Sequence, residues 1–198
     1  MSRRWPGQTV AIVASGPSLQ NANLDALEAV PVIAVNDNWQ KVPFAQILYA
    51  ADGPWWQHHR GVPGFAGERW TQNRGRPRDW ATQAARMGLT VIRSVNRPGV
   101  STASNLIHTG GNSAFQAMNL AVIAGANRIL LLGCDMTGKH WFGEHPKSLR
   151  KPSPYGRFRR AFEEAAPQLK QLGVRVINCS PISRIQAYPK MTLEEALQ

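Results

Sequence analysis

Two short segments of this chain are almost uninterruptedly apolar. One reads VAIVAS at positions 10–15, and the other reads RILLLG at positions 128–133. Strands without a polar face are typical of a parallel sheet that is covered on both sides. Segments of similar character recur along the chain, and we predict strands at 9–14, 32–35, 46–50, 90–93, 128–132 and 174–178.

Helical patterns lie between these strands. Ser113 with Gln116, and Thr192 with Glu195, have the spacing of capping boxes, and Gly125 suits a helix end. The alternation predicts an α/β fold, a Rossmann-like and mostly parallel sheet with helices on both faces. A length of 198 residues suits one domain over positions 1–198. We predict its main helices at 22–29, 112–124 and 158–172.

Two segments do not follow this alternation. Residues 53–108 are rich in Gly, Pro, Arg and Trp, and residues 136–157 are polar, basic and interrupted by Pro and Gly. Both are too long for simple connections in a compact domain. We therefore expect an Arg/Trp-rich insertion at about 53–108 and a lid at about 136–157.

The net charge of +11 favours a polyanionic partner. Arginine forks bind phosphates in a bidentate manner, and tryptophan faces stack on bases or sugars. An acceptor such as nucleic acid or a charged glycan is therefore expected at the insertion. The alternative is a solvated basic face with the tryptophans in a small subsidiary core. The residues that we expect to contact the acceptor are Arg74, Arg76, Arg78, Trp55 and Trp56.

The cysteines and the hydropathy of the chain indicate in which cellular compartment the protein is expected. Cys134 and Cys179 lie far apart in apolar stretches, match no metal or redox spacing, and are expected to be reduced core thiols. The N-terminus has no apolar signal region, and no run approaches the ~18 apolar residues of a membrane span. These observations predict a cytoplasmic protein without a membrane span.

Small polar residues follow nearly every predicted strand. Because ligands of open parallel sheets bind outside the carboxyl ends of the strands, these residues are expected to meet at one rim. Gly16 would let a ligand approach the backbone, and the free N–H groups of two glycine corners would face phosphates. Any one of these segments alone is ordinary turn chemistry. Together they predict a nucleotide site made of Ser15, Gly16, Pro17, Ser18, Asn36, Asp52, Gly111, Asn112 and Ser113.

The predicted lid carries the densest set of chemical groups. Asp135, His140 and His145 lie within eleven positions, and histidine is the natural acid or base near neutral pH. We expect these three residues to be catalytic, and the sequence does not choose between the two histidines. The same three residues are alternatively ligands for a divalent metal such as Mg²⁺, although their spacing matches no standard metal motif. No P-loop or dinucleotide fingerprint is present.

Several segments together resemble one known superfamily. VASGPSL, IAVNDNW, GGNSAFQAMNLAVIAGANRILLLGCDM and GVRVINCSPIS are similar to segments of bacterial sialyltransferases that use CMP-sialic acid. The same superfamily holds archaeal-type 6-hydroxymethylpterin diphosphokinases and small bacteriophage proteins, and the chain is most similar to the phage members. The resemblance implies a nucleotide held at Ser15–Ser18, Asn36 and Gly111–Ser113, and a lid histidine as general base.

The sequence also departs from these transferases. Ser15 stands where they usually have Asn, and Met136 and Thr137 follow Asp135 where they place tyrosines. The resemblance still implies a nucleotide-dependent transferase, glycosyltransferase-like, with a CMP- or other NDP-linked sugar donor. A phage-encoded protein would then work in the host cytoplasm. The alternatives are a metal-dependent diphosphokinase of a small heterocycle and a non-catalytic nucleic-acid-binding protein.

Overall fold

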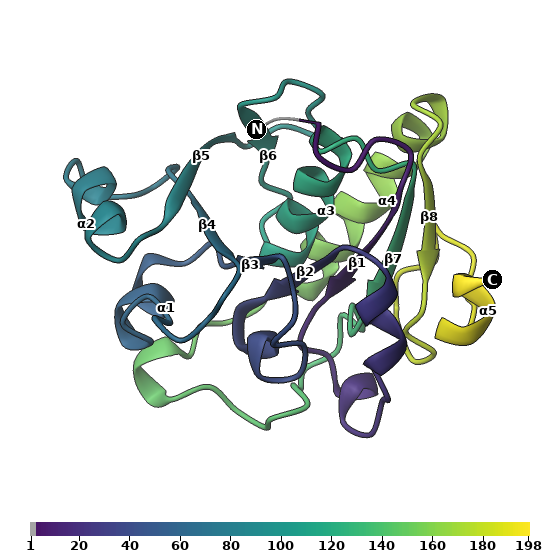
Figure 1. Cartoon of the computed structure of the whole chain (residues 1–198), viewed down its shortest axis with the longest axis horizontal. Coiled ribbons are helices and arrows are strands. Elements are labelled where there is room, and N and C mark those ends of the chain that lie inside the picture. Colours follow the sequence, from purple (N-terminus) through teal and green to yellow (C-terminus); the bar gives the residue numbers. More distant parts are fainter. Residues whose placement is uncertain (1–2) are drawn as a thin grey trace.

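A single parallel sheet forms the centre of the molecule (Figure 1). The computed structural model describes residues 3–198. The sheet order is β6-β5-β4-β3-β2-β1-β7-β8, and all the pairings are parallel. The α/β class predicted from the sequence is therefore confirmed. The strands are β1 (Thr9–Val13), β2 (Val32–Val35), β3 (Ile47–Tyr49), β4 (Glu68–Gln72), β5 (Thr90–Val95), β6 (Leu106–His108), β7 (Arg128–Leu132) and β8 (Arg175–Asn178).

Helices cover both faces of the sheet. Successive residues of β1 point to opposite sides, so that Val10 and Ile12 belong to one apolar core and Ala11 and Val13 to the other. Helices α3 (Ser113–Ile123) and α4 (Tyr155–Gln171) pack on the first face. The second face is covered by α1 (Gly53–His58), α2 (Trp80–Arg86), α5 (Leu193–Leu197) and the 3₁₀ turns η1 (Pro17–Leu19) and η2 (Asp25–Ala29).

Helix α3 lies at the centre of one face and is buried almost all round. Its N-cap is Asn112, whose side chain accepts a hydrogen bond from the backbone N–H of Phe115. The predicted capping box of Ser113 and Gln116 was therefore wrong by one residue. Gly125 follows the helix with φ +97°, as expected for its C-terminal stop.

Residues 53–108, which we expected to form an insertion, instead belong to the sheet. They supply β4, β5 and β6 at one edge, and α1 and α2 on the face beside them. Trp55, Trp56 and Trp80 are at most 4% exposed and lie in the core of that face. The side chains of Trp55 and Trp56 therefore cannot offer free stacking faces to a polyanion, which corrects their predicted role.

The chain order reverses once across the sheet. Strands β1 to β6 are laid down in sequence in one direction, and the chain then crosses through α3 to place β7 beside β1. All eight carboxyl ends lie along the same rim, as parallel pairing requires. Residues 133–154 join β7 to α4 along this rim, contain most of the predicted lid and carry one short 3₁₀ turn, η4 (Lys147–Leu149).

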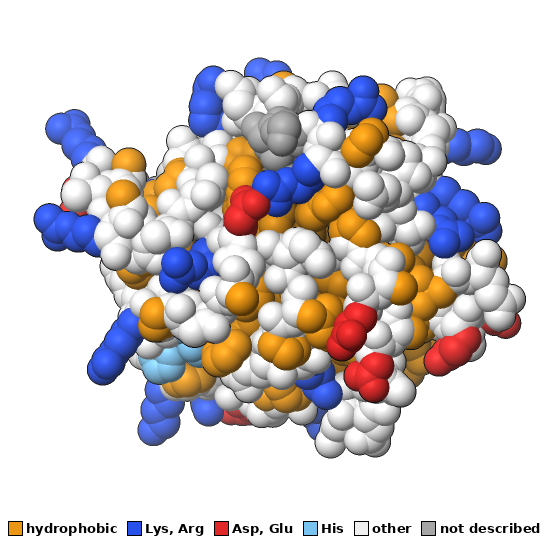
Figure 2. Space-filling view, viewed as in Figure 1, with side chains coloured by type: hydrophobic (Ala, Val, Ile, Leu, Met, Phe, Trp, Pro, Cys, Tyr) orange, Lys and Arg blue, Asp and Glu red, His pale blue; other side chains and the backbone are white. Residues whose placement is uncertain are grey.

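The basic side chains are dispersed over the face of the molecule that Figure 2 shows. Lysine and arginine side chains project from several sides of the face in Figure 2 and do not form one continuous stripe there. Among residues 3–198, no helix is long and apolar enough to cross a membrane.

Candidate functional site

The Ser15–Ser18 corner after β1 is occupied by a side chain of the protein itself. The Asp135 carboxylate accepts a hydrogen bond from the Ser18 backbone N–H at 2.8 Å and another from the Ser18 hydroxyl at 2.7 Å. Asp135 is only 1% exposed. The corner does bind an anion, as its backbone donors predicted, but this anion comes from the end of β7.

The reason for glycine at position 16 follows from this contact. A Cβ atom there would lie 2.4 Å from the Asp135 carboxylate and 2.5 Å from the Gly133 carbonyl oxygen. Gly16 is in an ordinary extended conformation with φ −64°, so backbone freedom is not the requirement. We expected Gly16 to admit a ligand to the backbone, whereas in the structure it admits Asp135. Pro17 begins the following 3₁₀ turn and completes the corner.

Trp141, a residue of the lid, is hydrogen-bonded to this corner and to Asn38 beside it. Its backbone N–H donates to the Ser15 carbonyl at 3.1 Å, and its indole Nε1 donates to Asn38 Oδ1 at 2.9 Å. The Asn38 amide in turn donates to the Ser15 hydroxyl at 2.9 Å. Ser15 therefore supports the lid, through its carbonyl oxygen and through Asn38.

A group of histidines lies beside the fastened lid, around the carboxylate of Asp37. His59 Nε2 lies 3.3 Å from Asp37 Oδ1, and His145 Nδ1 lies 3.9 Å from Asp37 Oδ2. The indole of Trp55 donates to the same carboxylate at 3.1 Å. Burial acts to raise the pKa of Asp37, but the hydrogen bonds from His59 and Trp55 outweigh it and lower the pKa. Asp37 is therefore held as a carboxylate that faces two imidazoles.

The two lid histidines are in ring contact, with centroids 4.7 Å apart. Burial lowers the pKa of His145, and Asp37 opposes the shift without cancelling it. Burial and the neighbouring His145 likewise lower the pKa of His140, which also stacks on Phe142. Both imidazoles are therefore biased toward the neutral form, which is the form that a general base requires.

Asn36, at the end of β2, has an unusual backbone. Its φ is +53°, and the side chain is half-buried. Asparagine tolerates this left-handed conformation better than most residues, but it still stores strain, and such strain concentrates at functional sites. Asn36 lies at the rim, directly after β2, and its place in a ligand site stays a prediction.

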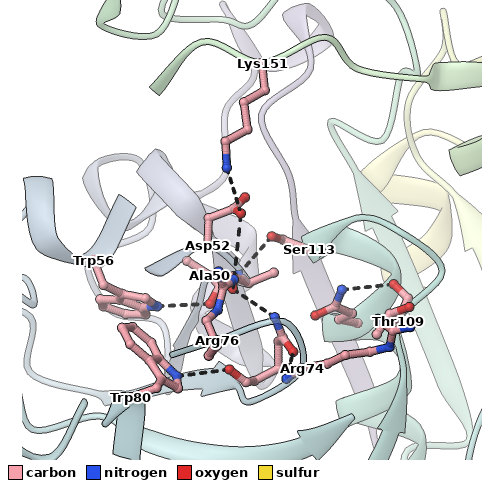
Figure 3. A network of polar contacts seen from close by, with 12 residues as sticks. Ala50, Asp52, Trp56, Arg74, Arg76, Trp80, Thr109, Ser113 and Lys151 are labelled. Carbon is pink, nitrogen blue, oxygen red and sulfur yellow. Dashed lines mark hydrogen bonds and ion pairs between the residues drawn. The ribbon is translucent and has the colours of Figure 1, made fainter. Parts of the chain in front are cut away.

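Asp52 connects the histidine group to a second group of charges. Its carboxylate lies 3.5 Å from Lys151 Nζ and 3.8 Å from a guanidinium nitrogen of Arg76, and its charge also acts on His145 (Figure 3). Arg76 additionally donates to the Ala51 carbonyl oxygen and lies over the Trp80 ring. Lys151 belongs to the lid, so Asp52 ties the lid to the end of β3.

Beyond Asp52 lies an open pocket of about 330 Å³. It is formed by the carboxyl ends of β3 to β6 and by the N-terminal end of α3. Of the predicted nucleotide residues, Asp52 and the corner of Gly111, Asn112 and Ser113 line it. Ser113 is buried and accepts a hydrogen bond from the Ala51 backbone N–H, so it holds the corner against β3. Three arginines also line this pocket: Arg74, Arg76 and Arg157.

The predicted residues thus divide into two halves of one rim. Ser15–Ser18 and Asp135 form a closed corner under the lid, and Gly111–Ser113 line the open pocket. Arg78, which we expected at the acceptor site, is exposed and does not line the pocket.

The structure does not bring Asp135, His140 and His145 together as the ligands of one metal ion. Among residues 3–198, no group of three His, Cys, Asp or Glu side chains could hold a metal ion. Asp135 is turned to Ser18, whereas His145 is turned to Asp37.

Some residues of the site were not among those selected from the sequence. Asp37 and His59 form the centre of the histidine group, and Arg157 lines the pocket from the start of α4. The signal for Asp37 was its place directly after β2, in the same polar segment as Asn36. Arg157 gave no comparable signal, because only the fold brings α4 beside the Gly111 corner.

Comparison with known proteins finds similarity at the level of structure. No protein-family model matches the chain, and no curated protein matches it either. A solved structure of the MAf glycosyltransferase from Magnetospirillum magneticum AMB-1 superposes with a TM-score of 0.62 at 15% identity, over 96% of this chain. The present chain spans about a third (34%) of that protein.

A second structure is similar over nearly its whole length. The sialyltransferase CstII from Campylobacter jejuni, solved with the substrate analogue cytidine-5′-monophosphate, gives a TM-score of 0.58 at 12% identity. The match covers 94% of this chain and 86% of CstII. At these identities the comparisons show a shared fold: the chain has the α/β architecture that is found in these two glycosyltransferases.

Proposed function

We propose that this protein is a nucleotide-dependent transferase that moves a sugar from a nucleotide-sugar donor to an acceptor. The observation that carries the proposal is the placement of His145. A half-buried imidazole, biased toward its neutral form and facing a buried carboxylate, lies at the sheet rim beside a ligand-sized pocket. The fold shared with two glycosyltransferases, one of them solved with a cytidine nucleotide, supports the same function.

In the proposed reaction His145 acts as general base. It takes the proton from an acceptor hydroxyl, whose oxygen forms a bond to the donor's anomeric carbon while the bond from that carbon to phosphate breaks. The Asp37 carboxylate stabilises the imidazolium that forms, as carboxylates beside catalytic histidines do. His140 contacts His145 from the lid side and would exclude water from it.

The donor is placed along the rim between the histidines and the pocket. Asn36, Asp52, Gly111 and Asn112 remain the proposed nucleotide-binding residues, and Ser113 holds the corner against β3. Ser18 has both of its donors committed to Asp135, so we assign the Ser15–Ser18 corner to shaping the wall and not to holding the nucleotide phosphates. The acceptor we expect is anionic, because the rim arginines would favour it.

Nucleotide binding is tested by thermal unfolding with CMP, UDP, GDP and ATP, each with and without Mg²⁺. A ligand present at about 100 times its Kd adds about 2.7 kcal/mol to the free energy of unfolding. Stabilisation by CMP or another nucleoside phosphate without metal supports the proposal. The absence of any nucleotide effect, together with DNA binding that weakens steeply with salt, would favour a non-catalytic nucleic-acid-binding protein.

The base is tested in the variant His145→Ala, with His108→Gln as the matched control. His108 lies at the end of β6 and contacts only the carbonyl oxygens of Pro98 and Gly99 through its ring. Loss of a general base lowers the rate by about 10²- to 10⁴-fold. We expect this loss of donor hydrolysis or transfer in H145A, a smaller one in Asp37→Asn, and none in H108Q. Equal rates in H145A and the parent protein would contradict the assignment.

A further inference from the structure

The neutral polar side chains of the 330 Å³ pocket are engaged with the protein. The Gln72 amide donates to the Ala51 carbonyl oxygen, and its oxygen accepts from Ser94. The Gln116 amide donates to the Thr109 carbonyl oxygen (Figure 3). Ser113 accepts from the Ala51 backbone. These groups fix the wall of the pocket and leave little hydrogen-bonding capacity for a ligand.

The groups left without partners are all donors. Within the described residues, the guanidinium groups of Arg74 and Arg157 have neither a hydrogen bond nor an ion pair. Two further nitrogens of the lining, Asn112 Nδ2 and Arg76 Nε, are buried and have no partner. Buried donors without partners are costly, and nearly all of those in native proteins are satisfied by protein or ordered water. The Arg74 and Arg157 side chains are exposed at the mouth of the pocket, where their guanidinium groups are free to bind an anion.

The charge of the lining is also unbalanced. Three guanidinium groups line the pocket with one carboxylate, that of Asp52, which already faces Arg76 and Lys151. A guanidinium has five N–H donors and no acceptor, and Asn112 already uses its side-chain oxygen to cap α3. The missing group must therefore be rich in acceptor oxygens and carry more than one negative charge.

We propose that this pocket is a phosphate-binding subsite, in which Arg74 and Arg157 hold a phosphate dianion in front of a wall that contains the buried nitrogens Asn112 Nδ2 and Arg76 Nε. A phosphate dianion offers several acceptor oxygens and two charges, which match two unpaired arginines better than a carboxylate does. Arg74 follows β4 and Arg157 opens α4, so the two arginines approach from separate elements.

Gly111 places the second arginine. A Cβ atom at position 111 would lie 3.0 Å from one guanidinium nitrogen of Arg157. The bare backbone therefore lets the Arg157 guanidinium lie over the corner and toward the pocket. The site itself needs no transferase activity. It rests on the proposed function only for the source of the phosphate, which belongs either to the nucleotide donor or to a phosphorylated acceptor.

The experiment measures binding of inorganic phosphate by isothermal titration at constant ionic strength. The test variants are Arg74→Gln and Arg157→Gln. Each has a matched control that removes the same charge outside the pocket: Arg78→Gln, from the same loop as Arg74, and Arg160→Gln, from the same helix as Arg157. Arg78 and Arg160 are exposed and do not line the pocket.

We expect R74Q and R157Q each to weaken phosphate binding at least tenfold, and the two controls to stay within twofold of the parent. Equal weakening in the controls would show attraction by net charge alone and overturn the subsite. So would equal affinity for phosphate and glucuronate, since the latter carries only a carboxylate. Failure of the proposed transfer with the phosphate result intact leaves the subsite standing.

Competition between ligands distinguishes whether the phosphate belongs to the nucleotide donor or to a phosphorylated acceptor. If phosphate and CMP compete while glucose 6-phosphate binds no tighter than inorganic phosphate, the subsite takes the donor's phosphate. If glucose 6-phosphate displaces phosphate and CMP binds alongside it, the subsite takes a phosphorylated acceptor. Either result supports the subsite. If inorganic phosphate, CMP and glucose 6-phosphate all fail to bind, the subsite is overturned.

Discussion

Two glycine corners lie on the same rim of the sheet, and they are used in opposite ways. The corner after β1 is closed: the Asp135 carboxylate takes both the N–H and the hydroxyl of Ser18, and Gly16 has no room for even one more carbon atom. The corner before α3 is open: among residues 3–198 its Asn112 amide nitrogen has no partner, and neither do the guanidinium groups of the two arginines that flank the pocket in front of it, Arg74 and Arg157.

The comparison shows that a glycine corner by itself does not identify a ligand site. Both corners offer backbone donors, small residues and a following helical turn. What separates them is whether a carboxylate from elsewhere in the chain already satisfies the donors. The closed corner then contributes stability and a rigid wall, and the open one retains the capacity to bind.

Removal of the internal carboxylate should have the largest effect. Asp135→Ala removes two hydrogen bonds from the part-buried donors of Ser18 to a charged group, at about 1.5–3 kcal/mol for each. We expect the free energy of unfolding to fall by about 4 kcal/mol in urea titrations. Because the variant opens the closed corner to an external anion, 0.2 M formate should raise its Tm more than that of the parent.

Asp25→Asn is the control for this variant, since Asp25 is exposed and its side chain has no hydrogen-bond or ion-pair partner among residues 3–198. It should unfold within about 0.5 kcal/mol of the parent, as surface substitutions usually do. If the free energy of unfolding of D135A falls by less than 1 kcal/mol, the two corners do not differ as described, because the closed corner would then need no carboxylate.

Alanine at the two glycines should separate the corners by a smaller margin. Gly16→Ala forces a Cβ atom against a buried carboxylate and a backbone oxygen, and overpacking of this kind costs about 1–3 kcal/mol. Gly111→Ala meets the flexible Arg157 side chain, which can move, so its cost is about 1 kcal/mol and comes from the positive φ. G111A should in addition weaken phosphate binding, and G16A should not. The reverse pattern would exchange the roles of the corners.

The smallest effect expected is a dependence of stability on pH. Folding lowers the pKa values of His140 and His145, so the unfolded chain binds protons more readily than the folded one. Stability should be full above the ordinary histidine pKa of 6.5 and should fall as the pH drops below it, toward the folded values. The lowered pKa of Asp37 acts only near and below pH 4.

Urea titrations between pH 7.5 and 5.5 measure this dependence. The double variant His140→Gln/His145→Gln should reduce the slope of stability against pH, whereas His108→Gln should preserve it. An unchanged slope in the double variant would assign the acid sensitivity to groups outside the lid.

The sequence predicted the strands with continuous apolar runs best. Val32–Val35 and Arg128–Leu132 have the bounds expected for them, because burial on both faces leaves an unmistakable pattern. Strand β4 begins with the polar pair Glu68 and Arg69, and β6 is only three residues long. Such polar or short segments lack a clear period, so residues 53–108 were mistaken for an insertion.

The sequence predicted where the candidate site lies better than it predicted what each of its residues does. The strand ends do meet at one rim, because parallel pairing requires it. The partner of Ser18 could not be found from local pattern, since Asp135 lies 117 positions further along the chain. The burial of Trp55 and Trp56 was also hidden, because tryptophan beside arginine is equally compatible with a core and with a stacking surface.

The bond between Ser18 and Asp135 also bears on how the chain folds. It joins the ends of β1 and β7, and these strands cannot pair until the whole segment between them has been brought into a loop. Contacts between such distant segments carry a high loop-closure entropy and slow folding. Refolding should therefore be slow, and a truncated chain ending before β7 should lack both the central pairing of the sheet and the closed corner.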